Sequence, residues 1–300
     1  MSHPRVSIGL PVYNGENFLD AAIESILAQD YCNFELIISD NASEDRTPVI
    51  CERYRRMDSR VRYVRAPTNR GAAWNYNHVF QLSSAPFFKW QAHDDLCLPA
   101  FLSRCLDAFD HAPASTVLVY PRAEIIDADG ARDDRFRPES LEALQPAPHQ
   151  RLATVLRNLN MACPVFGLIR VSALSQTRLI APFVAADYAL LAELAVLGTI
   201  HEVPEVLFQR RVHPRISTYA NRSSADLLRW YDPAKRASRT WISPQMALGR
   251  EYLRSVGRLP LSRRERLRCR MTIMSVWYER ELRNVGGKYK TRLKKSLGFE

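Results

Sequence analysis

The first hundred residues alternate short apolar runs with amphipathic helical patterns, and this alternation constrains the fold more than any other feature of the chain. Apolar runs typical of strands lie at residues 5–10, 34–39, 61–64 and 86–91. Between them, apolar residues at three- and four-residue steps predict a helix at 18–27. Thr47 as an N-cap with Pro48 at the first helical position predicts a second helix, and residues 74–82 are interpreted as a third. Strand–helix–strand repeats of this kind fold with right-handed crossovers into a mostly parallel sheet that helices cover on both faces. We therefore predict an α/β fold.

Polar and acidic side chains follow the ends of three of these predicted strands. Pro11-Val12-Tyr13-Asn14 comes after the first strand, Asp40-Asn41 after the second and His93-Asp94-Asp95 after the fourth. Open sheets with parallel strands bind their ligands at the carboxyl ends of those strands. The pattern therefore predicts a polar site along one edge of the sheet.

The adjacent acids Asp94 and Asp95 repel each other unless a positive group lies between or beside them. Mg²⁺ or Mn²⁺ bound together with a phosphate would meet this need, because both ions prefer carboxylate and phosphate oxygens. Asp95 could equally cap the helix that leads into Phe101. Asp40 leaves a similar choice, since it could accept hydrogen bonds from a nucleobase or only organise the turn that follows it.

Two further groups of residues late in the chain are candidates for catalysis. Asp187 lies in the apolar run Phe183-Val184-Ala185-Ala186, where burial would raise the pKa of its carboxyl group and suit it to act as a general base. An acid near a helix start also interacts favourably with the helix dipole without any further role. Arg210-Arg211-Val212-His213 could stabilise a phosphate leaving group or contribute to a metal site, or it could be a basic surface loop.

Several common chemistries are excluded by missing motifs. The chain has no G-x-G-x-x-G, no G-x-x-x-x-G-K-[ST], no G-x-S-x-G and no C-x-x-C, which argues against dinucleotide dehydrogenases, P-loop NTPases, the common hydrolase fold and a cysteine zinc site. The six cysteines are interpreted as reduced thiols. No apolar run approaches the roughly 18 residues of a membrane span, and the first residues do not resemble a secretory leader. We therefore expect a cytoplasmic protein.

The later part of the chain is predicted to contain helices at 101–109, 150–159 and 184–197 and strands at 117–120, 124–127 and 203–209, with an irregular loop at 131–150. Residues 201–300 hold 23 Lys and Arg against 9 Asp and Glu, which indicates an anionic partner or a solvated basic face. Ser262-x-x-Glu265 predicts a capping box that opens a long helix. Its apolar stripe of Leu267, Met271, Met274, Tyr278 and Leu282 is expected to pack on the domain.

At this point the order of motifs resembles family 2 glycosyltransferases over about residues 5–217. The matching stretches are Val6–Asn14, Ile23-x-x-Ile26-Leu27-Ala28-Gln29, Ser39–Asp45 with Thr47, Asn69-x-Gly71, Lys89–Asp95 with Pro99, Ala186-Asp187-Tyr188-x-Leu190 and Arg211-Val212-His213-x-x-x-Ser217. The resemblance implies a GT-A fold at 1–217, with a nucleotide-binding half at about 1–100 and an acceptor half at about 101–217. Residues 218–300 are then a basic helical extension outside the resemblance.

What the resemblance implies is an inverting transferase that moves a sugar from a nucleotide diphosphate, UDP by default, to an acceptor hydroxyl. Asp187 is then the base, and Asp95 and His213 hold a divalent Mn²⁺ or Mg²⁺. The residues implied to bind the nucleotide sugar are Pro11, Val12, Tyr13, Asn14, Asp40, Asn41, Arg70, Gly71, Asp94 and Arg211. The expected setting is the synthesis of a polysaccharide or glycolipid.

Two departures from the family pattern leave an alternative function open. Ala92-His93-Asp94 stands where the family has an acidic D-x-D stretch, and Ala186-Asp187 stands where it has Glu-Asp. The alternative is therefore a catalytically silent protein of the same fold that binds nucleotide sugars or acts as a scaffold. A nucleic-acid partner is not expected, because it would leave the acidic edge unexplained. The basic extension is predicted to cover the acceptor side or to contact anionic membrane lipid, most directly through residues 285–300.

Overall fold

The computed structural model describes residues 3–216, 223–234 and 244–296. Ser217, the last residue of the predicted motif series, lies outside this part of the chain. Among the described residues, no helix is both long enough and apolar enough to cross a bilayer.

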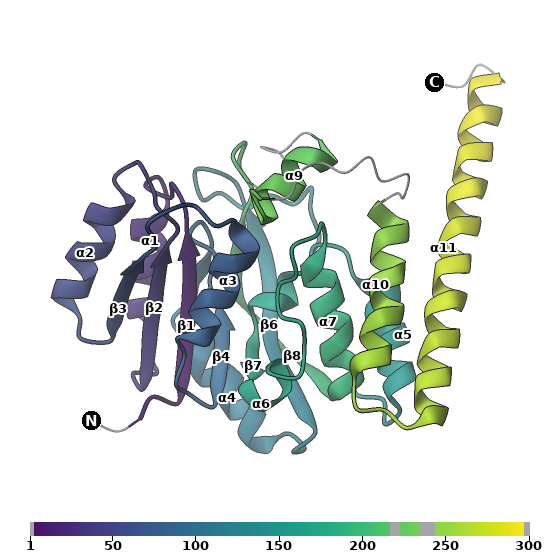
Figure 1. Cartoon of the computed structure of the whole chain (residues 1–300), viewed down its shortest axis with the longest axis horizontal. Coiled ribbons are helices and arrows are strands. Elements are labelled where there is room, and N and C mark those ends of the chain that lie inside the picture. The colour runs from purple at the N-terminus through teal and green to yellow at the C-terminus, as the bar shows by residue number, and fades with distance from the viewer. Residues whose placement is uncertain (1–2, 217–222, 235–243, 297–300) are drawn as a thin grey trace.

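A single curved sheet of eight strands forms the centre of the molecule, in the order β3-β2-β1-β4-β7-β6-β8-β5 (Figure 1). β1 to β4 are mutually parallel, β7 runs antiparallel to β4 and β6, and β8 pairs parallel with β6. The predicted α/β fold is therefore confirmed. The strands are β1 Val6–Val12, β2 Phe34–Asp40, β3 Val61–Arg65, β4 Phe87–Trp90, β5 Leu96–Cys97, β6 Thr116–Ile126, β7 Leu168–Arg170 and β8 Thr199–Arg211.

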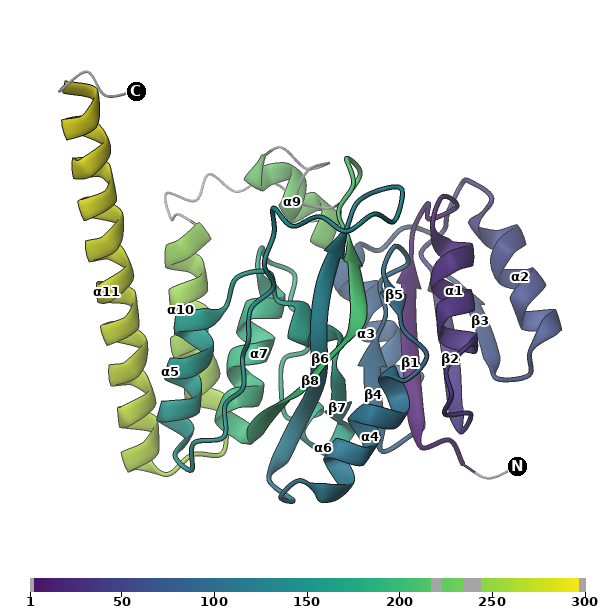
Figure 2. The same ribbon diagram turned by 180° about the vertical axis from the view of Figure 1, so that it is seen from behind.

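Helices cover both faces of the sheet. The helices are α1 Leu19–Leu27, α2 Thr47–Met57, α3 Ala72–Gln81, α4 Phe101–His111, α5 Pro148–Asn158, the 3-10 turn η1 Cys163–Phe166, α6 Val171–Leu174, α7 Ala186–Leu197, α9 Ser224–Tyr231, α10 Pro244–Arg258 and α11 Arg263–Ser296. One face packs α1, α2 and α4 into a buried apolar cluster, and the other packs α3, α6 and α7 (Figures 1 and 2). This two-sided burial explains why all seven residues of β1 are buried, the polar Ser7 included.

The predicted strands at 117–120 and 124–127 are one strand, β6, whose pairing with β8 shifts register on both sides of Arg122. Pro121 cannot donate a ladder hydrogen bond, and a shift at this point accommodates it. The segment 131–150 is irregular as predicted, but its middle is packed. Leu141 and Ala143 are fully buried, and Ala143 forms an isolated bridge to Ile200.

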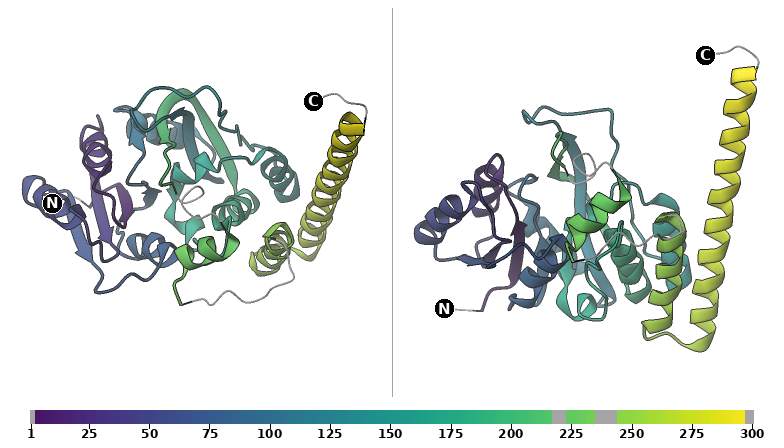
Figure 3. Two further views of the ribbon diagram at one scale, coloured as in Figure 1. Left: turned by 90° about the horizontal axis from the view of Figure 1, so that it is seen from above. Right: turned by 45° about the horizontal axis from the view of Figure 1, so that its top comes forward.

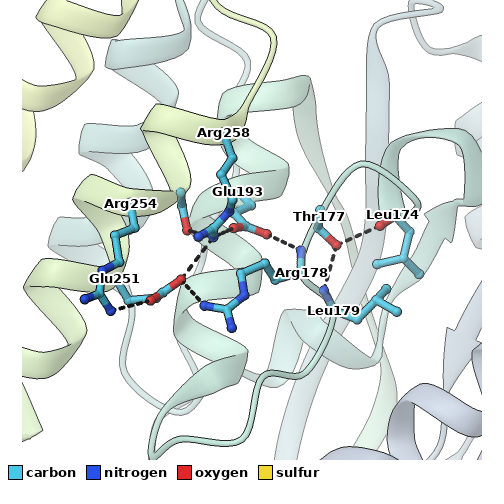
Figure 4. A network of polar contacts seen from close by, with 9 residues as sticks. Leu174, Thr177, Arg178, Leu179, Glu193, Glu251, Arg254 and Arg258 are labelled. Carbon is cyan, nitrogen blue, oxygen red and sulfur yellow. Dashed lines mark hydrogen bonds and ion pairs between the residues drawn. The ribbon is translucent and has the colours of Figure 1, made fainter.

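The C-terminal helices dock on the outer side of α5 and α7 through a third apolar cluster (Figure 3). Beside it, Glu193 of α7 and Glu251 of α10, both almost fully buried, share the guanidinium of Arg258 at 2.9 and 3.0 Å (Figure 4). Arg178 completes this network, because its backbone N–H donates to Glu193 and its side chain donates to Glu251. Buried carboxylates paired in this way hold the extension against the sheet domain.

The expected packing of the α11 stripe is wrong. The helix opens with the predicted capping box, in which Ser262 and Glu265 bond each other's backbone N–H. Its buried face carries Cys269, Ile273 and Val276, whereas Leu267, Met271, Met274 and Tyr278 are 54 to 66% exposed. Leu282 belongs to the part of α11 whose side chains are not described. The stripe points away because α5 and α10 pack against the opposite side of the helix.

Candidate functional site

A cavity of about 290 Å³ opens where β1, β2, β4 and β8 end. Its wall includes the loops that follow β1 and β4, the start of α3, the residues after β8 and the end of α9. These segments are far apart in the sequence, and the parallel sheet brings them together at one edge. The predicted position of the site, at the carboxyl ends of the strands, therefore coincides with the cavity found.

The loop after β1 lines one end of this cavity with Pro11, Val12, Tyr13 and Asn14. It is tied to the loop after β2, because the Asn14 backbone N–H donates to Ser43 at 2.9 Å and the Asn14 side chain accepts from the backbone N–H of Glu44. Asn14 has a positive φ of 52°, which Asn tolerates better than most residues. The tie leaves Tyr13 41% exposed at the cavity, as an aromatic surface on which a planar ring can stack.

Asn41, and not Asp40, reaches the cavity wall from the end of β2. Asp40 is fully buried behind it, where its carboxylate accepts hydrogen bonds from the Ser43 backbone and the Tyr63 hydroxyl and pairs with Arg65 at 3.1 Å. These three partners give Asp40 the turn-organising role that the sequence left open.

Arg70 and Gly71 also lie outside the cavity wall, although their neighbours Asn69 and Ala72 line it. The guanidinium of Arg70 lies 4.2 Å from the ring centroid of Trp74, on the surface of α3. Gly71 has a φ of 85°, and a Cβ built there would lie 2.4 Å from the backbone oxygen of Tyr231. Gly71 therefore allows α9 to approach the start of α3, and this is a packing role.

Asp94 and Asp95, which the sequence groups as one pair of acids, contact different residues. The Asp94 carboxylate faces His213, with Oδ2 and Nε2 3.1 Å apart. Asp95 accepts a hydrogen bond from the backbone N–H of Arg211 at 2.8 Å and so joins the β4 loop to the end of β8. Gln91 also holds this loop, because its Nε2 donates to the Asp95 backbone oxygen at 2.7 Å.

The electrostatics separate the two carboxylates further. Burial acts to raise the pKa of Asp94, but His93 and the hydrogen-bonded His213 outweigh it and hold that pKa below its usual range. Burial and the neighbouring charge of Asp94 raise the pKa of Asp95. Asp94 is consequently the carboxylate that stays ionised at the cavity.

Arg210 and Arg211 are adjacent at the end of β8, and their side chains bond to different loops. Arg211 is 7% exposed, its side chain donates to the backbone oxygens of Asp94, Asp127 and Ala128, and its guanidinium lies 4.8 Å from the centroid of Phe18. Those bonds fix loops in place and occupy most of its donors. Arg210 lines the cavity together with Arg211, and its side chain donates to the Met161 backbone oxygen and to Cys163.

Asp187 lies in the first turn of α7, next to the cavity without lining it. Burial raises the pKa of its carboxyl group, as its apolar sequence context predicted. Burial first, and then the charges of Asp94, Asp95 and Asp187, raise the pKa of the Tyr76 phenol. Asp95 and Asp187 also act on Arg210, whose pKa they raise against the effect of its burial. Tyr76 and Arg210 both line the cavity, so the acids meet around these two side chains.

A family model described as glycosyl transferase family 2 matches residues 7–178, which is more than half of the chain. The chain belongs to glycosyl transferase family 2. An uncharacterized glycosyltransferase of Rickettsia typhi is 28% identical over 222 residues, which cover 72% of this chain and 66% of that protein. The putative glycosyltransferase EpsE of Bacillus subtilis is 33% identical over 138 residues, which cover 46% of this chain and 49% of EpsE. The family 2 chain therefore spans less than two thirds of the length of these relatives.

Solved glycosyltransferase structures share the fold. TarS 1–349 of S. aureus in complex with UDP-GlcNAc superposes with a TM-score of 0.62 at 15% identity, covering 92% of this chain and 73% of TarS. The mannosyltransferase PcManGT of Pyrobaculum calidifontis, in complex with GDP-Man and Mn²⁺, gives a TM-score of 0.54 at 14% identity, covering 99% of this chain and 81% of that one. These likenesses confirm the GT-A fold predicted for the family 2 chain.

Part of the cavity wall of this family 2 chain was not predicted from the sequence. Tyr76 reads as one more aromatic residue of an amphipathic helix, and nothing in the pattern of α3 marks it. Arg229 and Trp230 of α9 lie beyond both the family match and the predicted motif series, yet both line the cavity. Arg210, by contrast, belongs to the basic stretch that the sequence singled out, and it lines the cavity as Arg211 does.

The chemistry of this wall fits a divalent cation held partly by a ligand. No cluster of three or more His, Cys, Asp or Glu side chains able to hold a metal was found among residues 3–216, 223–234 and 244–296. The pair formed by Asp94 and His213 offers one carboxylate and one imidazole from two different loops. Mg²⁺ and Mn²⁺ sites commonly use one or two protein ligands together with phosphate oxygens and water. The family 2 chain therefore suits a metal that arrives with a phosphorylated substrate.

Proposed function

We propose that this chain is an inverting glycosyltransferase that moves a sugar from a nucleotide diphosphate sugar to an acceptor hydroxyl, in the synthesis of a polysaccharide or glycolipid at the cytoplasmic side of a membrane. One observation carries the proposal. Asp94, paired with His213, lines the cavity, Asp187 lies beside it, and the charges of both carboxylates act on Tyr76 in the cavity wall. Asp94, which stays ionised beside His213, is suited to hold a metal ion on the diphosphate. Asp187, whose carboxyl group has a raised pKa, is suited to act as a general base.

The proposed reaction is one displacement at the anomeric carbon. The acceptor oxygen forms a bond to that carbon, the bond from the carbon to the diphosphate oxygen breaks, and Asp187 takes the proton of the acceptor hydroxyl. Arg210 lies where it can offset the negative charge on the departing diphosphate. Asp94 and His213 would hold Mn²⁺ or Mg²⁺, which would supply further positive charge to the diphosphate. Asp95 would position this pair by fixing the loop between β4 and α4.

The nucleotide end of the donor is placed at Tyr13 and Asn41. Tyr13 can stack on a base, and Asn41 is the polar side chain that lines the wall at the end of β2. UDP remains our default nucleotide. TarS is named with UDP-GlcNAc and PcManGT with GDP-Man, so the fold accommodates more than one base.

The alternative of a silent binding protein rests on Ala92 and Ala186. The position of Ala186 in the structure gives this alternative little support. Ala186 is 1% exposed and belongs to the apolar cluster between the sheet and α7. An alanine at this position therefore removes nothing from the cavity wall. Ala92 does line the cavity, next to the pair that would hold the metal.

The proposed activity can be tested on the full chain with UDP, GDP and dTDP sugars in the presence of Mn²⁺. Calorimetry measures binding, and release of nucleoside diphosphate measures turnover with and without candidate acceptors. We expect one nucleotide class to bind and to be slowly hydrolysed even without acceptor. Tight binding with no turnover for any donor or acceptor would favour the silent protein, and no binding of any of these nucleotides would refute both.

α9 is proposed to form the acceptor side of the cavity. Trp230 and Arg229 line it, and the phenol of Tyr231 hydrogen-bonds the backbone of Ala185, two residues before Asp187. An indole in a cavity wall packs well against the apolar face of a sugar ring, and α9 thereby brings an aromatic surface to the end of the cavity nearest the proposed base.

Trp230→Ala is expected to raise the KM for the acceptor about tenfold, because an aromatic contact of this kind is worth on the order of 1 kcal/mol beyond the area it buries. The KM for the donor should stay within about twofold, since Tyr13 and Asn41 are untouched. Trp74→Ala is the matched control, because Trp74 stacks on His78 outside the cavity. Equal effects of the two variants on the acceptor KM would refute the assignment of α9.

A further inference from the structure

The α11 stripe, which we define as Leu267, Met271, Met274 and Tyr278, is a continuous apolar surface without a partner among the described residues. The four side chains are 59, 62, 54 and 66% exposed. Their spacing of four, three and four residues places them within a narrow sector of the helix surface, because an α-helix turns about 100° per residue. α11 itself is the outermost helix on its side of the molecule (Figures 1 and 3).

The side of α11 opposite the stripe packs against the rest of the molecule, and this packing fixes the direction in which the stripe faces. Cys269 and Ile273 are buried in the third apolar cluster with α5, α7 and α10. Arg157 of α5 pairs with Glu279 at 3.1 Å, which holds the helix two turns further along. The helix cannot turn the stripe inward without losing this packing, so the stripe is presented outward by a firmly docked helix.

Arginines border the stripe on both sides. At about 100° per residue, Arg263 and Arg270 fall along one border and Arg264 and Arg268 along the other, and all four are exposed. The acids in this part of the helix point elsewhere, since Glu265 bonds Ser262 and Glu279 pairs with Arg157. Over its whole length α11 contains twelve Lys and Arg against three Glu.

We propose that the α11 stripe and its arginine borders form a surface that binds the headgroup region of an anionic lipid bilayer. Apolar residues of an amphipathic helix enter the boundary between headgroups and acyl chains, and the basic residues beside them meet lipid phosphates. A second copy of the chain fits less well, because packing stripe on stripe would bring the four bordering arginines of each copy close to those of the other. The surface is distinct from the cavity, and the proposal stands or falls independently of the proposed reaction.

Flotation of the full chain with lipid vesicles tests this surface. We expect binding to vesicles of phosphatidylcholine with 30 mol% phosphatidylglycerol, as an order-of-magnitude choice of surface charge, and little binding to pure phosphatidylcholine. Added salt should weaken the binding, because the arginine borders act through screened charges. Changing Leu267, Met271 and Met274 together to Ser should lower the fraction bound at least about tenfold.

Two controls keep the result specific to α11. Val49→Ser with Met57→Ser removes apolar side chains that are just as exposed, at 67 and 71%, but lie on α2, and it should leave vesicle binding unchanged. The stripe variant should keep the thermal midpoint and the vesicle-free donor hydrolysis of the wild type, because the changed side chains neither pack nor line the cavity. Three results would overturn the proposal: no binding to anionic vesicles at low salt, binding that survives the stripe variant, or a dimer in light scattering that the stripe variant dissociates while vesicles are not bound.

Discussion

Asp187→Asn is expected to lower kcat for sugar transfer by roughly 10²–10⁴-fold, the contribution typical of a positioned general base. Asparagine keeps the shape of the side chain and can still accept the hydrogen bond from the Tyr188 backbone N–H, so the start of α7 should remain intact. It cannot take the proton of an acceptor hydroxyl. The dissociation constant of the donor should change little, since Asp187 does not line the cavity, and calorimetry with the nucleotide sugar measures this directly.

The pH profile gives a second readout of the same residue. Burial raises the pKa of Asp187 above the usual value near 4. The base works only when ionised, so kcat of the wild type should be constant at high pH and fall as the pH drops through this raised pKa. In Asp187→Asn that acidic limb should disappear. The matched control is Glu193→Gln in the same helix, which weakens the network of Figure 4 and should lower the thermal midpoint while the limb persists. A wild-type limb that persists in Asp187→Asn would assign the base elsewhere.

Asp94→Asn is expected to have the second largest effect, a loss of at least about 10²-fold in kcat/KM with Mn²⁺ present. Losing even a residue that only supports a metal ligand commonly costs 10–100-fold in affinity or activity, and Asp94 is proposed to contact the ion itself. The amide would leave His213 with no anionic partner. Titration of Mn²⁺ in the presence of the nucleoside diphosphate should show weaker metal binding as well.

Asp95→Asn is the contrasting variant for this prediction. Its Oδ1 accepts from the Arg211 backbone, and an asparagine oxygen can do the same. Because the pKa of Asp95 is already raised, losing its charge changes the site less than losing that of Asp94. We expect a decrease of less than about tenfold. A reversed order, with Asp95→Asn the more damaging for Mn²⁺ binding, would restore the assignment of the metal to Asp95 that the motif implied.

The position of the site could be predicted from the sequence, because strand ends are marked by where apolar runs stop. Pro11, Asp40 and Asp94 all follow such stops, and the parallel sheet places them at one edge. The sequence pattern does not show which of two neighbouring polar residues faces the cavity. Asn41 lines it and Asp40 does not, because the Asp40 carboxylate is buried against Ser43, Tyr63 and Arg65. Arg210 and Arg211 both line it.

Long-range packing explains the remaining differences. The side of α11 that is buried depends on α5 and α10, and the smaller set Cys269, Ile273 and Val276 was buried although the stripe is larger and equally regular. Trp230 reaches the cavity only because Gly71 lets α9 come close to α3. No periodicity within either segment encodes such a contact, since it belongs to two segments that are about 160 residues apart in the chain.

The network of Figure 4 bears on how this chain could be shortened. α7 begins beside the proposed base and, along its length, presents Glu193, Ala192 and Val196 to the C-terminal helices. Removing everything after the last recognisable family motif would remove α10 and α11. The buried carboxylate of Glu193 would then lose Arg258, and the apolar residues of α7 would be exposed to water. Minimal versions made for crystallisation or engineering should therefore retain the two final helices at least as far as residue 279, even though family resemblance alone would draw the border some sixty residues earlier.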